Sequence, residues 1–454
     1  MDSTPRVPSL DMDWSQVVEE TVHHLRALIR IPTVNPPGNE TAAAQYLADV
    51  LRAEGLDPVV VESAPGRGNL IVRVKGTGES APLLLLSHLD VVPAEPEQWT
   101  YPPFSGEVAD GMVWGRGALD MKGITALQLM TLLLLHRQQI PLKRDVIFAA
   151  TADEERGGKY GIRYLVEHHP DLIRAEVALS EFGGFNINIG GKRFYLIQSA
   201  EKGICQFVLR ARGEPGHGSM PRPHNAVVAL ADAVARLGRA RMPYRITLTT
   251  EAFVLGIARQ LGGLSGLLMR ALLNPLTGAW FLKHGPLEPS NRLFFHAMFH
   301  DTLAPTMLRA GEKVNVIPSQ AEAHVDARIL PGEDKHTFFE RVRQIVGDDI
   351  DIEEYLYEPP LQQPMDTAMW HLMTEELSQH DPEAAVIPYM VTGSTDAKAL
   401  ALLSIPCYGF APMRFPPGTD FLSLIHGHDE RIPISALAFG LPILYNVVRK
   451  YAAS

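Results

Sequence analysis

The chain of 454 residues is poor in cysteine and has neither a block of basic residues nor a long apolar run. Its two cysteines, Cys205 and Cys407, cannot form a disulfide framework, and neither belongs to a Cys-x-x-Cys pair. The most apolar stretch, 124–135, has about twelve residues, which is too few to span a bilayer. The net charge of −11 argues against nucleic acid and against an anionic membrane as partners.

The N-terminal end also lacks a recognisable targeting signal. Residues 1–16 are polar and do not show the basic and then apolar pattern of a signal peptide, so we expect a cytoplasmic protein. Hydrophobic residues make up 46% and charged residues 20% of the chain, as in soluble globular proteins. Because single cores rarely exceed about 250–300 residues, the length favours two domains.

Polar residues directly follow three of the apolar runs that we expect to be strands. The runs are 83–86, 146–150 and 177–179, and the residues after them are His88 and Asp90, Glu154 and Glu155, and Glu181. The carboxyl ends of parallel strands in an open α/β sheet border the crevice in which ligands bind. The sequence therefore predicts one crevice shared by these side chains.

The residue types in this crevice are those of a metal site. Imidazole and carboxylate together are typical ligands of zinc, with cobalt and manganese as alternatives. Two cations about 3.5–4 Å apart need a bridging anion, and Asp120, which follows a glycine-flanked turn, is the candidate. Each cation then needs a terminal histidine and a terminal carboxylate. The candidates for these positions are His88, His426, Glu155 and Glu181. We therefore expect two divalent metal ions, with Zn²⁺ first.

Two further carboxylates lie beside the candidate ligands. Neighbouring residues on an extended segment point in opposite directions. If Glu155 faces a metal, Glu154 faces the water between the metals, where it would take a proton and pass it to the leaving amine. Asp90, two residues after His88, would accept the other imidazole N–H and fix the tautomer.

The second half of the chain changes character near Gly203. Alternating apolar and polar residues from Cys205 onward predict an antiparallel strand. We expect 204–361 to be a smaller α+β domain inserted into a catalytic domain made of 1–203 and 362–454. Within it, 253–299 is unusually rich in Leu, Gly and Ala. This segment either packs as helices against a neighbour or dimer partner, or forms an apolar wall or lid for a hydrophobic substrate group.

The motifs of the chain resemble the M20 metallopeptidase family in order and spacing. They are SHLDVVP, W-x-x-x-P-F-x-G, GRGALDMKG, TADEERGG, SEFGG, AEKG, GHGSMP, KVNVIP, DARILPG, GSTDAK and HGHDE. That family includes aminoacylases, carboxypeptidases and succinyl-diaminopimelate desuccinylase. The resemblance extends from about Val22 to the end of the chain, and is greatest to the carboxypeptidase S and N-acyl-amino-acid hydrolase branch.

The resemblance implies both a fold and a set of metal-site residues. The fold is α/β, with a mixed-sheet catalytic domain of the zinc-peptidase type. An inserted α+β (ferredoxin-like) domain serves as the lid and as the dimerisation domain of a homodimer. The resemblance implies that His88, Asp120 and Glu181 bind one metal and that Asp120, Glu155 and His426 bind the other. It also implies that Glu154 is the general base and that Asp90 is the carboxylate that orients His88.

Five further residues are implied in substrate binding. His217 matches a histidine that reaches the active site of the partner subunit and stabilises the tetrahedral oxyanion, a role that suits an N–H donor. Arg328 and Asn315 match substrate-binding positions, and Arg328 would pair with the free carboxylate of an amino acid. Gly393 and Ser394 would contact the same carboxylate.

Two positions depart from the family pattern or leave a choice. The family usually has glycine where this chain has Phe182, directly after Glu181. At the C-terminal motif both His426 and His428 are available. His426 is preferred because a glycine follows it and Glu430 lies four residues on.

The sequence therefore predicts a dinuclear metal amidohydrolase that cleaves N-acyl-L-amino acids into a carboxylate and a free amino acid. A dipeptidase or carboxypeptidase acting on short peptides is the alternative within the same class. A binding protein with a decayed metal site is the alternative outside it, and the presence of every candidate ligand argues against it. The expected partners are the small substrate and a second copy of the chain, without nucleic acid and without a membrane span.

Overall fold

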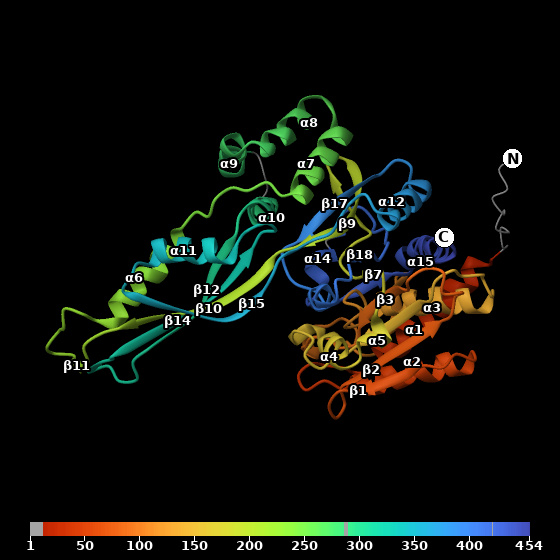
Figure 1. Ribbon diagram of the computed structural model, residues 1–454, viewed down its shortest axis with the longest axis horizontal. Helices are drawn as coiled ribbons and strands as arrows, with labels where there is room; N and C mark the ends of the chain where they lie inside the picture. Colours follow the sequence, from red (N-terminus) through yellow and green to blue (C-terminus); the bar gives the residue numbers. More distant parts are fainter. Residues whose placement is uncertain (1–11, 286–288, 420) are drawn as a thin grey trace. The chain divides into compact units, whose positions relative to one another are not determined.

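The computed structural model describes residues 12–285, 289–419 and 421–454 and divides into two compact units (Figure 1). The first combines Met1–Asn186, Asp366–Pro382 and Leu402–Ser454, and the second combines Ile187–Met365 and Glu383–Ala401. The ends of the expected inserted domain, 204 and 361, lie inside the second unit rather than at its borders. The reason is that β9 (Lys192–Glu201) and β17 (Ala385–Val391), which lie outside those ends, pair with each other.

A mixed sheet forms the centre of the first unit. Its strands follow the order β1 (Val59–Glu62), β2 (Gly68–Val74), β6 (Val146–Thr151), β3 (Leu83–His88), β7 (Val177–Ser180) and β18 (Cys407–Gly409). β3 is parallel to β6 and β7, and β7 to β18, whereas β2 is antiparallel to β1 and β6. All residues of β3, β6 and β7 are buried, which explains their continuous apolar sequences. The expected α/β class with a mixed sheet is confirmed.

Helices pack around this sheet. They are α1 (Trp14–Ile29), α2 (Glu40–Ala53), α3 (Lys122–Arg137), α4 (Ile162–His168), α5 (Pro170–Ile173), α12 (Ala368–His380), α14 (Phe421–Leu424) and α15 (Ile434–Ala453). α3 contacts β3, α1 and α15 and is buried from Lys122 to Leu135, which explains why its sequence is apolar on nearly all sides. A small sheet of β4 (Glu107–Ala109), β5 (Met112–Trp114) and β19 (Arg431–Pro433) joins the C-terminal motif to the segment before Asp120.

The second unit contains a four-stranded antiparallel sheet. The strands follow the order β12 (Thr302–Ala310), β14 (Gln320–Ile329), β10 (Gly203–Arg212) and β15 (Ile350–Glu358). Residues of α6 (Ala226–Arg239) and α11 (Lys335–Val346) share one hydrophobic core with this sheet, and burial alternates along β14. The chain order β-α-β-β-α-β is that of a ferredoxin-like unit. β11 (Gly216–His217) and β13 (Val316–Ile317) form a separate pair.

The remaining elements of the second unit include the Leu-rich segment. β17 pairs with β9 in parallel, and β16 (Leu361–Gln362) pairs with β9 antiparallel. The helices here are α7 (Leu248–Leu261), α8 (Gly263–Arg270), α9 (Pro275–His284), α10 (Pro289–Phe299) and α13 (Ala397–Leu400), and β8 (Phe185–Ile189) precedes β9. α7 packs on β17 and β9. Among the described residues, none of the helices combines the length and the apolar character that crossing a membrane requires.

Candidate metal centre

The predicted metal ligands lie at one edge of the first unit's sheet. His88 is the last residue of β3, Glu155 lies in the turn after β6, and Glu181 follows β7. Because β3 runs parallel to β6 and β7, the three strands end at the same edge. Asp120 stands just before α3, and His426 just after α14. All five residues belong to one unit, and the fold brings their side chains together.

Asp120 stands between the two histidines. Its Oδ1 lies 3.0 Å from Nε2 of His88, and its Oδ2 lies 3.2 Å from Nε2 of His426. An oxygen of Glu181 is 3.5 Å from the His88 nitrogen, and an oxygen of Glu155 is 3.1 Å from the His426 nitrogen. Two ligands of a tetrahedral zinc ion, each about 2.0–2.1 Å from it, stand about 3.3 Å apart. The spacing therefore suits two cations that share Asp120.

The carboxylates of this cluster shift the proton affinity of its histidines. Burial opposes a proton on His88, but the carboxylates of Glu181 and Asp120 outweigh burial and hold the pKa of His88 well above its usual range. Hydrogen bonds to Asp120 and Glu155 raise the pKa of His426 to about 10. Without metal, protons on the imidazoles balance the carboxylates, and a divalent cation would replace those protons on binding. The charge of the cluster therefore suits cations as well as its spacing does.

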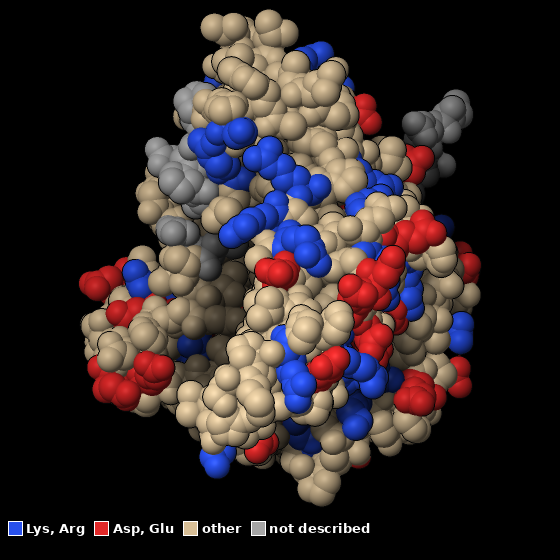
Figure 2. All heavy atoms as spheres, turned by 90° about the vertical axis from the view of Figure 1, so that its left-hand side faces the viewer, with Lys and Arg blue, Asp and Glu red and all other residues tan. Residues whose placement is uncertain are grey.

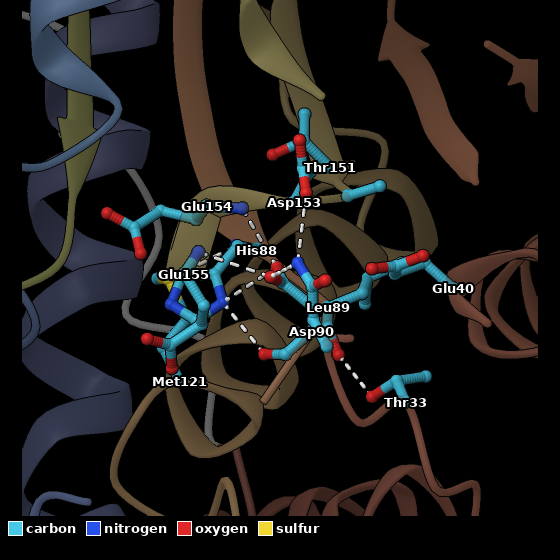
Figure 3. Close-up of polar contacts among 12 residues, drawn as sticks. Thr33, Glu40, His88, Leu89, Asp90, Met121, Thr151, Asp153, Glu154 and Glu155 are labelled. Atoms are coloured by element: carbon cyan, nitrogen blue, oxygen red, sulfur yellow. Dashed lines mark hydrogen bonds and ion pairs between the residues drawn. The ribbon is translucent and has the colours of Figure 1, made fainter. Parts of the chain in front are cut away.

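Glu154 also reaches the cluster. His88, Asp120 and Glu155 place ligand atoms within 4.8 Å of one another, and so do His88, Glu154 and Glu181. Glu154 is the first residue of the short 3-10 helix η2 (Glu154–Arg156) that follows β6, and its carboxylate points away from Asp90 (Figure 3). Distance alone is compatible with either a ligand or a base at this position. The general-base role of Glu154 stays a prediction.

Asp90 ties together the segments that carry His88 and the two glutamates (Figure 3). Its carboxylate accepts the backbone N–H groups of Glu154 at 3.0 Å and Glu155 at 3.1 Å. Nδ1 of His88 lies 3.0 Å from the backbone carbonyl of Asp90 and 3.5 Å from its carboxylate. Because a carbonyl only accepts, this contact places a proton on Nδ1 and leaves Nε2 for a metal. Asn35, which no motif indicates, donates to the Asp90 carboxylate at 2.8 Å.

Glu430 holds the turn that carries Asp120. This fully buried carboxylate accepts three backbone N–H groups, from Gly117 at 3.0 Å, Leu119 at 2.7 Å and Asp120 at 3.1 Å. Nη1 of Arg116 donates to it at 2.7 Å. Burial raises the pKa of Glu430, and Arg116 together with the backbone N–H groups opposes that rise. In the sequence, Glu430 only favours His426 over His428 as the candidate ligand, and no motif indicates that it accepts these backbone N–H groups.

Two residues beside the cluster have the left-handed backbone conformation that favours glycine. Phe182 has φ 56° and His426 has φ 60°. The position after Glu181 therefore keeps a conformation that glycine adopts freely, although it carries an aromatic side chain. At the C-terminal motif, His426 contacts the cluster, whereas Nε2 of His428 lies 3.6 Å from a carboxylate oxygen of Glu95.

A narrow apolar cavity adjoins the cluster. Asp120 and Glu181 contribute its charged lining, and Leu119, Phe182, Phe185, Met413, Phe415 and Phe421 are among its other lining residues. The rings of Phe415 and Phe421 stack with their centroids 4.6 Å apart, and Phe185 meets Phe421 edge-on at 4.6 Å. An apolar group that enters this cavity would contact hydrocarbon side chains beside the candidate metal ligands Asp120 and Glu181.

The other predicted site residues belong to the second unit. His217 on β11 pairs with Val316 on β13, and the backbone N–H of Gly218 donates to the carbonyl of Asn315 at 2.9 Å, so His217 and Asn315 lie beside each other at this two-stranded pair. The backbone N–H of Ser219 donates to Nδ1 of His217 at 3.2 Å. In the neutral imidazole this contact places the proton on Nε2, so the exposed ring presents an N–H donor.

Arg328 is engaged inside its own strand. Its Nε and Nη2 donate to the two carboxylate oxygens of Asp326, at 2.7 and 3.1 Å. A substrate carboxylate would compete with that pair. Gly393 and Ser394 lie in the loop between β17 and α13, where the next residue, Thr395, donates its hydroxyl to the buried Glu201 at 2.5 Å. The substrate-binding roles of these residues stay predictions.

The mixed sheet and the cluster at its carboxyl edge define a class of protein, the hydrolases that hold metal ions with histidine and carboxylate. The chain belongs to peptidase family M20/M25/M40, whose model matches residues 84–450. The predicted family is confirmed, and the protein is a metal-dependent hydrolase of amide bonds.

Three similar proteins illustrate this membership. The chain is 30% identical to N-fatty-acyl-amino acid synthase/hydrolase PM20D1 of Bos taurus, over 98% of this chain and 90% of that protein. It is 26% identical to aminoacylase-1 of Sus scrofa, over 94% of each chain. The M20 family metallo-carboxypeptidase Sso-CP2 from Sulfolobus solfataricus shares the fold, with a TM-score of 0.70 at 19% identity, over 95% of this chain and 99% of that chain.

Proposed function

We propose that the protein hydrolyses N-acyl-L-amino acids whose acyl group is apolar, releasing a carboxylic acid and a free amino acid. The observation that carries this proposal is Phe182, an aromatic residue at φ 56° that lines the apolar cavity beside Asp120 and Glu181. The left-handed conformation costs a residue other than glycine roughly 1–2 kcal/mol. Such strain persists where the surrounding structure imposes it, often at a functional site.

The cavity supports an acyl chain better than a peptide N-terminus. The terminal ammonium of a dipeptide would need a carboxylate partner there, and the charged residues of the lining, Asp120 and Glu181, are candidate metal ligands. A hydrocarbon chain needs no such partner and gains about 0.8 kcal/mol for each buried CH₂ group. The similarity to the hydrolase PM20D1 and to aminoacylase-1 supports the same substrate class.

The proposed reaction uses two divalent cations, of which zinc best suits imidazole and carboxylate ligands. One cation would be bound by His88, Asp120 and Glu181, and the other by Asp120, Glu155 and His426. When bound, the pair supplies an acidic water and a polarised amide carbonyl. Glu154 takes the proton as the water oxygen bonds to the carbonyl carbon. It delivers that proton to the amide nitrogen as the C–N bond breaks, so the amino acid leaves as an amine.

Residues of the second unit would bind the rest of the substrate. Nε2–H of His217 would donate to the oxyanion that forms at the carbonyl, a contact that gains strength as charge develops. Arg328 would pair with the amino-acid carboxylate, with Asn315, Gly393 and Ser394 beside it. A homodimer follows from the proposed action of His217 across subunits. A cytoplasmic location agrees with two free, buried cysteines, since disulfides are rare in reducing compartments.

The experiment that tests the substrate class compares chain lengths. Glycine and phenylalanine carrying acetyl, octanoyl or oleoyl groups are assayed beside dipeptides of the same amino acids. We expect kcat/KM to rise with acyl length, and Phe182→Gly to reduce the rate on octanoyl and oleoyl substrates more than on acetyl substrates. Dipeptides turned over faster than every acyl amino acid would overturn the proposal in favour of a dipeptidase or carboxypeptidase.

A second variant separates the general base from a metal ligand. Glu154→Gln should lower kcat by about 10²–10⁴-fold, because general-base catalysis contributes that much. Its metal content, measured by elemental analysis, should equal that of the wild type. A parallel loss of metal would instead make Glu154 a ligand.

A further inference from the structure

Apolar side chains on α8 and α9 face outward in the part of the chain that the structure describes. On α8 the exposed leucines are Leu264, Leu267 and Leu268, at 71%, 65% and 45% exposure. On α9 the exposed apolar residues are Leu276 at 84% and Trp280 at 62%. Their spacings of three and four residues place them on one face of each helix. A surface helix usually exposes polar residues, whereas α8 and α9 bury Met269 and Leu282 on the inner side and carry apolar residues on the outer side as well.

Close packing on the inner side fixes this orientation. Gly266 of α8 is buried, and a Cβ there would stand 2.4 Å from the backbone oxygen of Ala258 on α7. Gly278 of α9 is also buried, and a Cβ there would stand 2.5 Å from the hydroxyl of Tyr244. At Gly266 the near atom is backbone, so the approach requires glycine, whereas at Gly278 a larger residue would have to displace the Tyr244 hydroxyl. The helices cannot roll to bury their leucines without losing both contacts.

Charge on the same segment is of one sign. Residues 252–287 contain no Asp or Glu, although the whole chain has a net charge of −11. Arg270 ends α8 and Lys283 lies in the last turn of α9, and both are exposed. Figure 2 shows mostly uncharged surface at the top, where Figure 1 places α8 and α9, with Lys and Arg side chains beside it.

We propose that α8 and α9 dock on an anionic lipid surface, with the five exposed apolar residues in the acyl boundary and Arg270 and Lys283 at the headgroups. Leucine and tryptophan on one face with basic residues and no acids is the composition of helices that lie in a membrane interface. At physiological salt the Debye length is about 8 Å, so acidic residues farther away are largely screened. The inference does not depend on which amide the enzyme cleaves.

Vesicle flotation with the full chain tests this docking. We expect the protein to float with vesicles of phosphatidylcholine and phosphatidylglycerol at physiological salt, and less at high salt. The triple variant L264S/L267S/L268S should lower the partition coefficient at least tenfold. R270Q/K283Q should lower it about fivefold for each base removed, on anionic vesicles only. Leu402→Ser, at a leucine of 70% exposure in the first unit, is the matched control and should bind as the wild type does.

Three results would overturn the proposal. One is a wild-type protein that does not float with vesicles of phosphatidylcholine and phosphatidylglycerol at millimolar lipid. Another is flotation that the triple variant leaves unchanged while its thermal unfolding matches the wild type. The third is a wild type that does not bind vesicles and is oligomeric in light scattering, together with a triple variant that is monomeric. That result would show that a second copy covers α8 and α9.

Discussion

Glu430→Gln is the substitution that most directly tests how the metal centre is positioned. Oε2 of Glu430 accepts from Arg116 and from the Gly117 N–H, and Oε1 accepts from the N–H groups of Leu119 and Asp120. Glutamine keeps the shape but replaces one of these oxygens with an NH₂ donor. In either amide orientation two buried donors then lose their acceptor.

The size of the effect follows from burial. Glu430 is 0% and Arg116 2% exposed, so the substitution leaves an arginine charge without its partner inside the protein. Removing one member of a buried ion pair costs about 3–5 kcal/mol. At roughly 2–4 °C per kcal/mol, the melting temperature of the first unit should fall by roughly 6–20 °C. Substituting a residue that orients a metal ligand typically lowers metal affinity by about 10–100-fold. Because Glu430 holds the turn that carries Asp120, we expect a loss of zinc affinity in the same range.

The assay combines differential scanning fluorimetry with a zinc titration against a chromophoric chelator. Glu97→Gln, at an exposed glutamate of the same unit, is the matched control and should change neither quantity. A Glu430→Gln protein that melts with the wild type and binds zinc with the same affinity would refute the reasoning. A large loss of stability with unchanged zinc affinity would refute only the link to Asp120.

The remaining predictions concern pH, substrate binding and metal removal. Burial lowers the pKa of His300 to about 4, below the ordinary 6.5 of unfolded chains. As pH falls below 6.5 the unfolded state therefore binds protons first, and the second unit should lose about 2 kcal/mol by pH 5. His300→Asn, which can still donate to the His296 carbonyl, should remove that loss in acid denaturation curves, whereas exposed His336→Asn should not. Arg328→Ala should raise KM roughly tenfold to a hundredfold, because a hydrogen bond to a charged group contributes about 1.5–3 kcal/mol. An unchanged KM together with lower stability would show that Arg328 serves only to pair with Asp326. Zinc at about 100 times Kd should raise the free energy of unfolding of the metal-free wild type by about 2.7 kcal/mol. The same zinc concentration should stabilise the Asp120→Asn variant less, and thermal melts of both proteins measure the difference.

The strand-end residues could be predicted because two signals coincide in the sequence. A run such as 83–86 is continuously apolar, which is typical of a strand buried on both faces. His88 and Glu181 each follow such a run after a single serine, so the parallel pairing of β3 and β7 is enough to bring them together. No knowledge of loops is needed for this step. The loop histidine, His426, depended on the family motif.

The groups behind the ligands could not be predicted, because they act on backbone atoms. Asn35 stands before a Pro-Pro-Gly turn and looks like a turn residue, yet it donates to Asp90, 55 positions away. Glu430 lies in a polar motif, HGHDE, that is typical of an exposed loop, but it is fully buried. Neither periodicity nor composition indicates that a carboxylate will accept backbone N–H groups of a remote turn.

The Leu-rich segment shows a different limit of sequence reasoning. Its composition predicts helices, and helices form. Whether a leucine is covered depends on which face carries the glycines, and at Gly266 and Gly278 the glycines take the inner side. One expectation is that the leucines pack against a neighbour or dimer partner, and the other is that they form a wall or lid against a hydrophobic substrate group. Their exposure on α8 and α9 opens the third option, a lipid surface.

The C-terminal motif does more than carry the candidate ligand His426. Arg116, which pairs with Glu430, also donates through Nη2 to the backbone carbonyl of His426 at 3.3 Å. The same ion pair therefore contacts the backbone of His426 and, through Glu430, the backbone of Asp120. These two candidate ligands contact each other at 3.2 Å although the chain separates them by more than half its length. If Asp120 holds both cations as proposed, the orientation of its carboxylate matters, and a backbone that is fixed before metal binding would preserve that orientation. The buried Arg116–Glu430 pair provides that hold, which is a reason for a chain to keep an ion pair whose net contribution to stability is often small.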